Sequence, residues 1–292
     1  MQQVKNSNYP STIFGRLWMK IPLVLRSILT GFGVSTIGIG IWVLLVSNLP
    51  IHWSVISMGV FLILFWMYFS GKWSPSNTQT FRRFCIRQTK LKKPVWIWGG
   101  VAAIFLFIFL NACLVFTFRI VEFQPEVFKT ASYLNDFPAW MSWSLILMAS
   151  LVAGLCEEVG YRGYLQTPLE QKYGHLAAIS ITSLVFVVIH LHQAWAGGIL
   201  VQIFAISFML GYLAYASNSL ILGIIAHASF DVVMFSYWWS DVIGTFEGKP
   251  ISMTGVDIHF IITIIVVLLS TLFFIVAIRR LLKLKTVNLE RV

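Results

Sequence analysis

Seven ionisable residues lie within strongly apolar stretches of the sequence, in three separate segments. They are Glu157, Glu158 and Arg162; His190 and His192; and His227 and Asp231. An ionisable group at membrane depth costs at least about 2.5–3.5 kcal/mol on insertion scales, so such groups indicate a functional site by default. Carboxylates and imidazoles can exchange protons with a bound water, which makes acid–base chemistry the first hypothesis.

The spacing of these residues separates pairs from unpaired groups. Glu158 and Arg162 stand four residues apart and would face each other along a helix, and such a pair is more often architectural than catalytic. Glu157 is rotated by about 100° from its neighbour and has no such partner, which suits a general base. His227 and Asp231 are also four residues apart, so the carboxylate can fix the tautomer and orientation of the ring.

Helix geometry allows the unpaired and paired groups to meet. At a rise of about 1.5 Å per residue, Glu157, His190, His227 and Asp231 lie at overlapping depths of about 10–22 Å from the ends of their helices. They can therefore converge on one cavity. His192 lies two residues beyond His190, on another face of the helix, and is left out of the predicted site.

The composition indicates an integral membrane protein. Of the 292 residues, 58% are apolar and 11% are charged, whereas soluble domains have about 45–50% and about 25%. This excludes a water-soluble enzyme, a disordered chain and a nucleic-acid-binding protein. We expect an all-α polytopic fold with about eight transmembrane helices. Hydropathy places them at Leu23 to Val46, Trp53 to Ser70, Val95 to Phe118, Trp140 to Leu169, His175 to His192, Gly197 to Ala216, Leu220 to Trp239 and Ile258 to Ile278.

The net charge of +10 predicts the orientation of these helices. Basic residues gather after the second and eighth candidate helices: Lys72, Arg82, Arg83, Arg87, Lys90, Lys92, Lys93, Arg279, Arg280, Lys283 and Lys285. With both termini in the cytoplasm, 18 of the 21 Lys and Arg residues lie inside, and only Arg119, Lys129 and Lys249 lie outside. By the positive-inside rule we expect this topology in the inner (plasma) membrane, with anionic lipids at the basic face and no nucleic-acid partner.

We expect one integral domain with three parts. Residues 1–138 would hold three spans and the basic loop, residues 139–240 the four spans with the ionisable groups, and residues 241–292 the last span and a basic tail. A stripe of small residues, Ser27, Gly31 and Ser35, predicts close helix packing in the first span. The three cysteines suggest neither a disulfide framework nor a zinc knuckle.

Three short motifs in residues 139–240 resemble those of a known family. The segment 157–162 resembles its EExxxR motif, 186–190 its FxxxH motif, and 227–231 its HxxxN/D motif. The three occur in order, within apolar segments, between about Trp140 and Trp239. They are similar to the signature of the CAAX-prenyl protease and bacteriocin-processing (CPBP, or Abi) family of intramembrane endopeptidases.

The resemblance implies a role for each residue of the predicted site. Glu157 and His190 would activate a water for attack on a peptide carbonyl, and His227 with Asp231 would stabilise the oxyanion. Glu158 and Arg162 would hold the site together. A zinc site of His190, His227 and a carboxylate is chemically conceivable. However, the sequence has no H-E-x-x-H motif, and the glutamate-base mechanism needs no metal, so we favour a cofactor-free site.

The leading hypothesis is an intramembrane endopeptidase that cleaves near the cytoplasmic face of the membrane. Its substrate would be a CAAX-like C-terminus, a peptide leader or the tail of a membrane protein. One alternative is a non-catalytic bacteriocin-immunity or scaffold protein with the same fold. A proton-coupled transporter is a weaker alternative, because the sequence lacks the paired repeats and broken helices of such proteins.

Overall fold

The structure, a computed structural model, describes residues 13–87, 91–122, 130–196, 198–240 and 249–289, and within these ranges it contains helices and no strand. The longer helices are α2 (Leu23–Asn48), α3 (Ile51–Phe69), α5 (Lys93–Ile120), α6 (Ala139–Glu157), α8 (His175–Ile189), α9 (Ile199–Ser217), α10 (Ile221–Trp239) and α12 (Ile258–Leu289). The shorter ones are α1 (Ile13–Lys20), α4 (Gln79–Cys85), α7 (Thr167–Tyr173), α11 (Ile251–Thr254), η1 (Ser76–Thr78), η3 (Ser132–Asp136), η4 (Glu158–Gln166) and η5 (Leu191–Ala196). The all-α prediction is therefore confirmed.

All eight predicted apolar segments form helices, but they are not equally long. In the part of the chain that the structure describes, seven helices are long and apolar enough to cross a membrane, counting α6, η4 and α7 as one. The eighth, α8, has 15 residues and ends at Ile189 rather than at the predicted His192. At about 1.5 Å per residue it spans only about 22 Å. The chain thus leaves its α-helix just before His190 and continues into η5.

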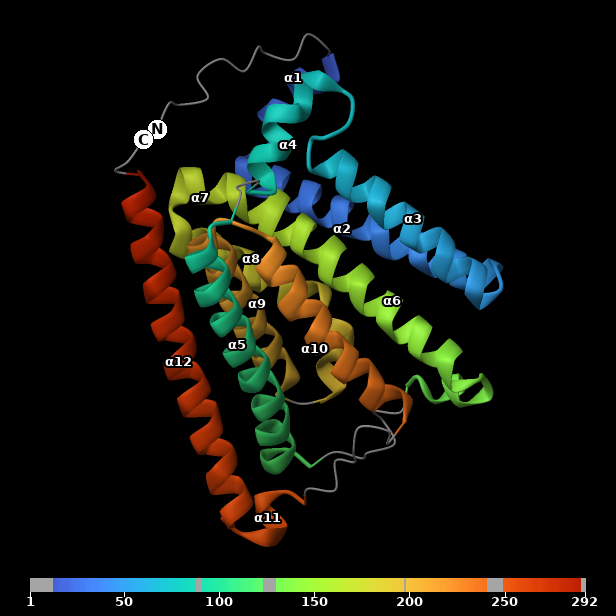
Figure 1. The fold of residues 1–292 in the computed structure, drawn as a ribbon, viewed down its shortest axis with the longest axis vertical. Coiled ribbons are helices and arrows are strands. Elements are labelled where there is room, and N and C mark those ends of the chain that lie inside the picture. Colours follow the sequence, from blue (N-terminus) through green and yellow to red (C-terminus); the bar gives the residue numbers. More distant parts are fainter. Residues whose placement is uncertain (1–12, 88–90, 123–129, 197, 241–248, 290–292) are drawn as a thin grey trace.

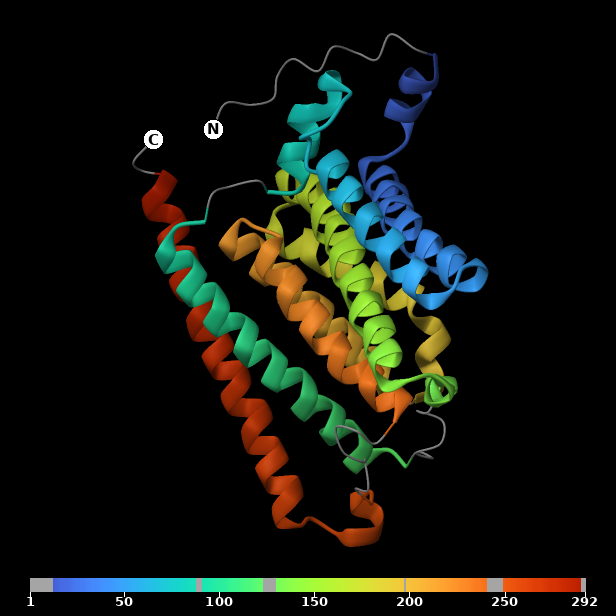
Figure 2. The same ribbon diagram turned by 45° about the vertical axis from the view of Figure 1, so that its right-hand side comes forward.

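Helices α5 and α12 lie side by side as a long pair along one edge of the molecule (Figures 1 and 2). Phe105 stacks on Phe273 with ring centroids 4.7 Å apart. At the end of the pair, Arg119 donates a hydrogen bond of 2.7 Å to Asp257, and this bond holds the pKa of the Asp257 carboxyl below its usual value. The pair supports α9 and α10, and α10 carries His227 and Asp231 of the ionisable cluster.

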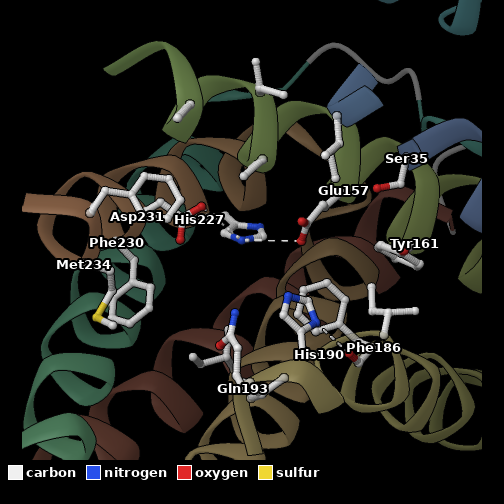
Figure 3. A pocket seen from close by; sticks show the side chains of 18 of the residues that line it. Ser35, Glu157, Tyr161, Phe186, His190, Gln193, His227, Phe230, Asp231 and Met234 are labelled. Carbon is white, nitrogen blue, oxygen red and sulfur yellow. Dashed lines mark hydrogen bonds and ion pairs between the residues drawn. The ribbon is translucent and has the colours of Figure 1, made fainter. Parts of the chain in front are cut away.

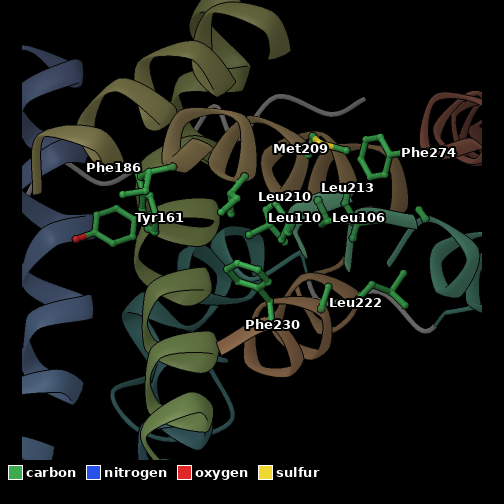
Figure 4. Packing of buried hydrophobic residues seen from close by; sticks show 14 of the residues in the cluster. Leu106, Leu110, Tyr161, Phe186, Met209, Leu210, Leu213, Leu222, Phe230 and Phe274 are labelled. Atoms are coloured by element: carbon green, nitrogen blue, oxygen red, sulfur yellow. The ribbon is translucent and has the colours of Figure 1, made fainter. Parts of the chain in front are cut away.

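The main apolar core joins this pair to the helices of the site. Leu106 and Leu110 of α5 pack with Leu210 of α9 and Phe230 of α10 (Figure 4). Outside this core, large apolar side chains are exposed along the outer faces of the helices. On α12, for example, Leu268 is 63% exposed. Such surfaces are expected where helices face lipid tails instead of water.

The fourth predicted span, Trp140 to Leu169, is not one continuous α-helix. Residues Glu158–Gln166 form a π-helical segment, η4, between α6 and α7. π-helical turns are rare and occur mostly at functional sites. The Thr167 hydroxyl donates a 3.0 Å hydrogen bond to the carbonyl of Arg162, five residues earlier. The EExxxR motif therefore lies on a widened helix, which its sequence did not predict.

The small-residue stripe of α2 packs directly against η4, as predicted. Gly31 and Gly160 meet where the two helices are closest: a Cβ atom on Gly31 would lie 2.8 Å from the carbonyl oxygen of Gly160. A Cβ on Gly160 would lie 2.5 Å from the carbonyl oxygen of Gly31. Side chains at these positions would push the helices apart, so glycine is required on both sides.

The basic segments of the described chain lie at one end of the bundle. Figures 1 and 2 place α1, α4 and the C-terminal end of α12 at this end, and α11 at the other. This arrangement agrees with the charge pattern that predicted a common side for both termini. Lys90, Lys129, residues 1–12 and residues 290–292 lie outside the described residues.

The topology can be tested by cysteine labelling in intact cells. Ser76→Cys, in the basic loop, is expected to resist a membrane-impermeant maleimide, because the positive-inside rule places this loop in the cytoplasm. Met253→Cys, on α11 and 63% exposed, should be labelled. Background from Cys85 and Cys156 should be low because both are buried. If Ser76→Cys were labelled and Met253→Cys were not, the chain would have the opposite orientation in the membrane.

Candidate active site

A cavity of about 450 Å³ lies among α2, α6, α8, α9 and α10. Figure 3 shows the side chains of four predicted site residues facing this cavity. Glu157 comes from the last position of α6, His190 follows the end of α8, and His227 and Asp231 lie on consecutive turns of α10. The structure thus brings together residues from three helices that the depth estimate had placed at similar levels.

The remaining two predicted residues form a buried ion pair beside the cavity. Arg162 Nη1 lies 3.1 Å from Glu158 Oε1, and both side chains are inaccessible to solvent. The same carboxylate oxygen accepts a 3.0 Å hydrogen bond from His227 Nδ1. Glu158 therefore links η4 to α10, and neither Glu158 nor Arg162 lines the cavity itself.

The ring of His227 is oriented by carboxylates on both of its edges. Because a carboxylate only accepts hydrogen bonds, the contact with Glu158 places a proton on Nδ1. Nε2 lies 3.5 Å from Asp231 Oδ2 and 3.9 Å from Glu157 Oε2. The sequence predicted that Asp231 would orient this ring; the shorter contact in the structure comes from Glu158. Nε2 is left at the cavity, between two further carboxyl groups.

The charges around His227 do not balance if the ring is neutral. Three carboxyl groups, those of Glu157, Glu158 and Asp231, lie within 4 Å of its nitrogens, and one guanidinium, that of Arg162, opposes them. Like charges in a poorly hydrated cavity repel strongly. The cluster therefore favours an imidazolium at His227, or a carboxyl proton shared with it, either of which supplies a hydrogen-bond donor to the cavity.

His190 is oriented by the backbone. Its Nδ1 lies 2.7 Å from the carbonyl oxygen of Phe186, which can only accept, so Nδ1 carries a proton, and Nε2 is an acceptor when the ring is neutral. The ring of Phe186 packs against His190 at 4.4 Å between centroids and lies 4.7 Å from the guanidinium carbon of Arg162. The first residue of the FxxxH motif thus supports two members of the site.

The cavity also contains polar residues that the sequence analysis did not assign to the site. His192 and Gln193, from η5, line it, as do Ser35 of α2 and Tyr161 of η4. His192 was left out because a continuous helix would turn it away. Because α8 ends before His190, the ring of His192 instead lies near the ring of His190, with centroids 5.9 Å apart. The early end of α8 had no signal in the hydropathy.

His190 and His227 each use Nδ1 in a protein contact and keep Nε2 for another ligand. Metal-bound histidines commonly donate their other ring N–H to a protein oxygen, so these contacts do not exclude zinc. Within the described ranges, no group of three or more His, Cys, Asp or Glu side chains is arranged to hold a metal ion, whereas a catalytic zinc usually has three protein ligands. The cofactor-free site stays a prediction, and the reaction proposed for this site uses no metal.

The chain was compared with known protein families. Residues 139–233 match the model of the Rce1-like family, described as type II CAAX prenyl endopeptidase Rce1-like. The resemblance drawn from the three motifs is thereby confirmed, and the matched segment runs from the start of α6 to Val233 of α10, so it includes all six predicted site residues. No curated protein and no solved structure matches the chain.

The ion pair of Glu158 and Arg162 can be tested through stability. Arg162→Ala is expected to lower the stability of the folded protein by about 3–5 kcal/mol, because it removes the guanidinium that pairs with the buried Glu158 carboxylate. Glu158→Ala should also lower it, and both should reduce any activity, since His227 loses its support. Thermal unfolding in detergent measures the effect.

Glu170→Gln provides the matched control. Glu170 pairs with Arg87 at 2.6 Å, at the basic end and outside the cavity. Its replacement should lower stability without changing the chemistry at His227. Unfolding temperatures of Arg162→Ala and Glu158→Ala equal to that of the wild type would refute the architectural role.

Proposed function

We propose that this membrane protein is an intramembrane endopeptidase that hydrolyses a peptide bond with a water activated by Glu157 and His190. The observation that supports this most is the arrangement of Glu157, His190 and His227 around one cavity between membrane-spanning helices. The match to the prenyl endopeptidase family supports a protease of this class.

The proposed reaction begins with a water held between Glu157 and Nε2 of His190, which is an acceptor. Glu157 takes a proton from the water as its oxygen attacks the peptide carbonyl carbon. The carbonyl oxygen becomes an oxyanion, which Nε2–H of His227 stabilises. The C–N bond then breaks, and the proton held by Glu157 passes to the leaving nitrogen. One water is consumed, giving a carboxylic acid and an amine.

In this proposal, Asp231, Glu158 and Arg162 set the charge and orientation of the His227 ring. Asp231 lies 3.5 Å from Nε2 and Glu158 holds Nδ1, so the two carboxyl groups favour the imidazolium and fix its plane. Arg162 offsets the charge of Glu158. The substrate would be a CAAX-like C-terminus, a peptide leader or the tail of a membrane protein, cut near the cytoplasmic face of the plasma membrane. Anionic lipids would border the basic end.

The direct test is peptide cleavage by the purified protein in liposomes. A library of peptides with varied C-terminal and internal sequences, analysed by mass spectrometry, should yield discrete products that require the wild-type protein. Unchanged peptides throughout, together with stable binding of a membrane protein, would favour the non-catalytic immunity or scaffold function instead.

A further inference from the structure

Ser35 is a buried polar residue that the proposed reaction does not use. It lies on α2, outside the segment that matches the prenyl endopeptidases. Its side chain is 1% exposed, and it lines the same cavity as Glu157. Its hydroxyl lies beside that of Tyr161 but makes no hydrogen bond of normal geometry in the described residues. A buried hydroxyl without such a bond loses stability, so its presence at a cavity wall suggests a ligand.

The contact between α2 and η4 fixes the position of Ser35. A Cβ atom on Gly160 would lie 3.0 Å from the Cβ of Ser35 and 3.1 Å from its backbone nitrogen. Gly31, one turn earlier, touches the carbonyl of Gly160 in the same way. The backbone at Ser35 is therefore pressed against the motif helix, and its hydroxyl is held at the edge of the cavity.

Tyr161 brings a second hydroxyl to the same wall. It follows Glu157 by four residues, is 2% exposed and lines the cavity. Its ring packs edge-on against Phe186, with centroids 5.3 Å apart, and its hydroxyl points towards α2 (Figure 4). Figure 3 shows Ser35 and Tyr161 on the side of the cavity from which Glu157 projects.

The chemistry of this wall fits a peptide backbone. An extended peptide inside the membrane must find partners for its N–H and C=O groups, because lipid supplies none. A hydroxyl both donates and accepts, so two neutral hydroxyls can pair with an amide, whereas a carboxylate or phosphate would call for a cation. The rest of the α2 wall is largely apolar, with Phe32, Ile39 and Trp42.

We propose that the hydroxyls of Ser35 and Tyr161 bind the backbone of the peptide substrate beside the scissile bond. They are positioning residues, and α2 becomes a wall that aligns the substrate with Glu157. This inference rests on the proposed endopeptidase function and adds a substrate-binding subsite to it.

The test compares Ser35→Ala and Tyr161→Phe with Ser27→Ala in steady-state cleavage of one peptide from the library. Ser27 belongs to the same buried stripe of α2 but does not line the cavity. Loss of one hydrogen bond to the substrate should raise KM about three- to tenfold in each of the first two variants, with kcat nearly unchanged. Ser27→Ala should leave KM unchanged.

Unfolding temperatures separate binding from packing. Ser35→Ala should unfold close to the wild-type temperature, because its hydroxyl contacts only the Tyr161 hydroxyl and makes no hydrogen bond of normal geometry. Tyr161→Phe keeps the ring that packs on Phe186 and serves as the second variant if Ser35→Ala does not fold. An unchanged KM in the folded variants, or equal effects of Ser35→Ala and Ser27→Ala, would overturn the subsite while leaving the endopeptidase function intact. If the wild-type protein cleaved no peptide, both the subsite and the endopeptidase function would be contradicted.

Discussion

Glu157→Ala is expected to abolish peptide cleavage while the protein remains folded in detergent. The carboxylate is the proposed base, and general acid–base catalysis typically contributes about 10²–10⁴-fold to the rate. Its side chain lies at the cavity, 3.9 Å from His227, whereas Glu158 makes closer contacts, of 3.1 Å with Arg162 and 3.0 Å with His227. Cleavage rates and unfolding temperatures of the purified variant measure the two properties separately.

Glu157→Gln is the matched control, because it keeps the shape of the side chain and removes its ability to take a proton. Both variants should lose activity to a similar extent and unfold close to the wild-type temperature. Full activity in either purified variant would rule out the proposed mechanism. Activity in the glutamine variant alone would show that Glu157 acts through hydrogen bonding and not as a base.

Asp231→Ala is expected to lower the cleavage rate by about 10²–10³-fold, the usual cost of one contact that stabilises an oxyanion. Asp231 lies 3.5 Å from Nε2 of His227, the proposed donor. Asp231→Asn should keep measurable activity, since an amide of the same shape offers an acceptor oxygen and a donor NH₂ group. The family that the three motifs resemble carries Asn or Asp at this position of its third motif, HxxxN/D.

A chelator separates this role from metal binding. On the metal-free mechanism, the wild type and Asp231→Asn should respond to neither chelator nor zinc. If Asp231 were an anionic metal ligand, Asn would bind the cation poorly and its activity would fall towards that of Asp231→Ala. An inactive Asp231→Asn variant that zinc restores would contradict the mechanism proposed here.

The sequence predicted the helices and most of the site because both depend on simple physical patterns. Apolar stretches of spanning length must form helices in lipid, since every backbone group needs a partner. Charged groups inside such stretches are costly, so Glu157, His190, His227 and Asp231 stood out against their surroundings. The spacing of Glu158 and Arg162 predicted the ion pair that the structure contains.

Features that depend on tertiary packing were not predictable in this way. The π-helical segment at Glu158–Gln166 has no composition signal, and its apolar neighbours fit an α-helix equally well. The end of α8 before His190 leaves the hydropathy unchanged, so His192 was assigned to the wrong face. Ser35 has the signal of a packing residue, and only the cavity beside it indicates a further role.

The short length of α8 has a consequence for the surrounding bilayer. Leu184 and Val188 of α8 are 58% and 62% exposed, so this helix faces lipid, yet its 15 residues cover about 22 Å of a hydrocarbon layer about 30 Å thick. Such hydrophobic mismatch is relieved by local thinning of the membrane. Local thinning beside α8 would bring the headgroup region and its water closer to His190, and the proposed reaction consumes one water molecule at that residue.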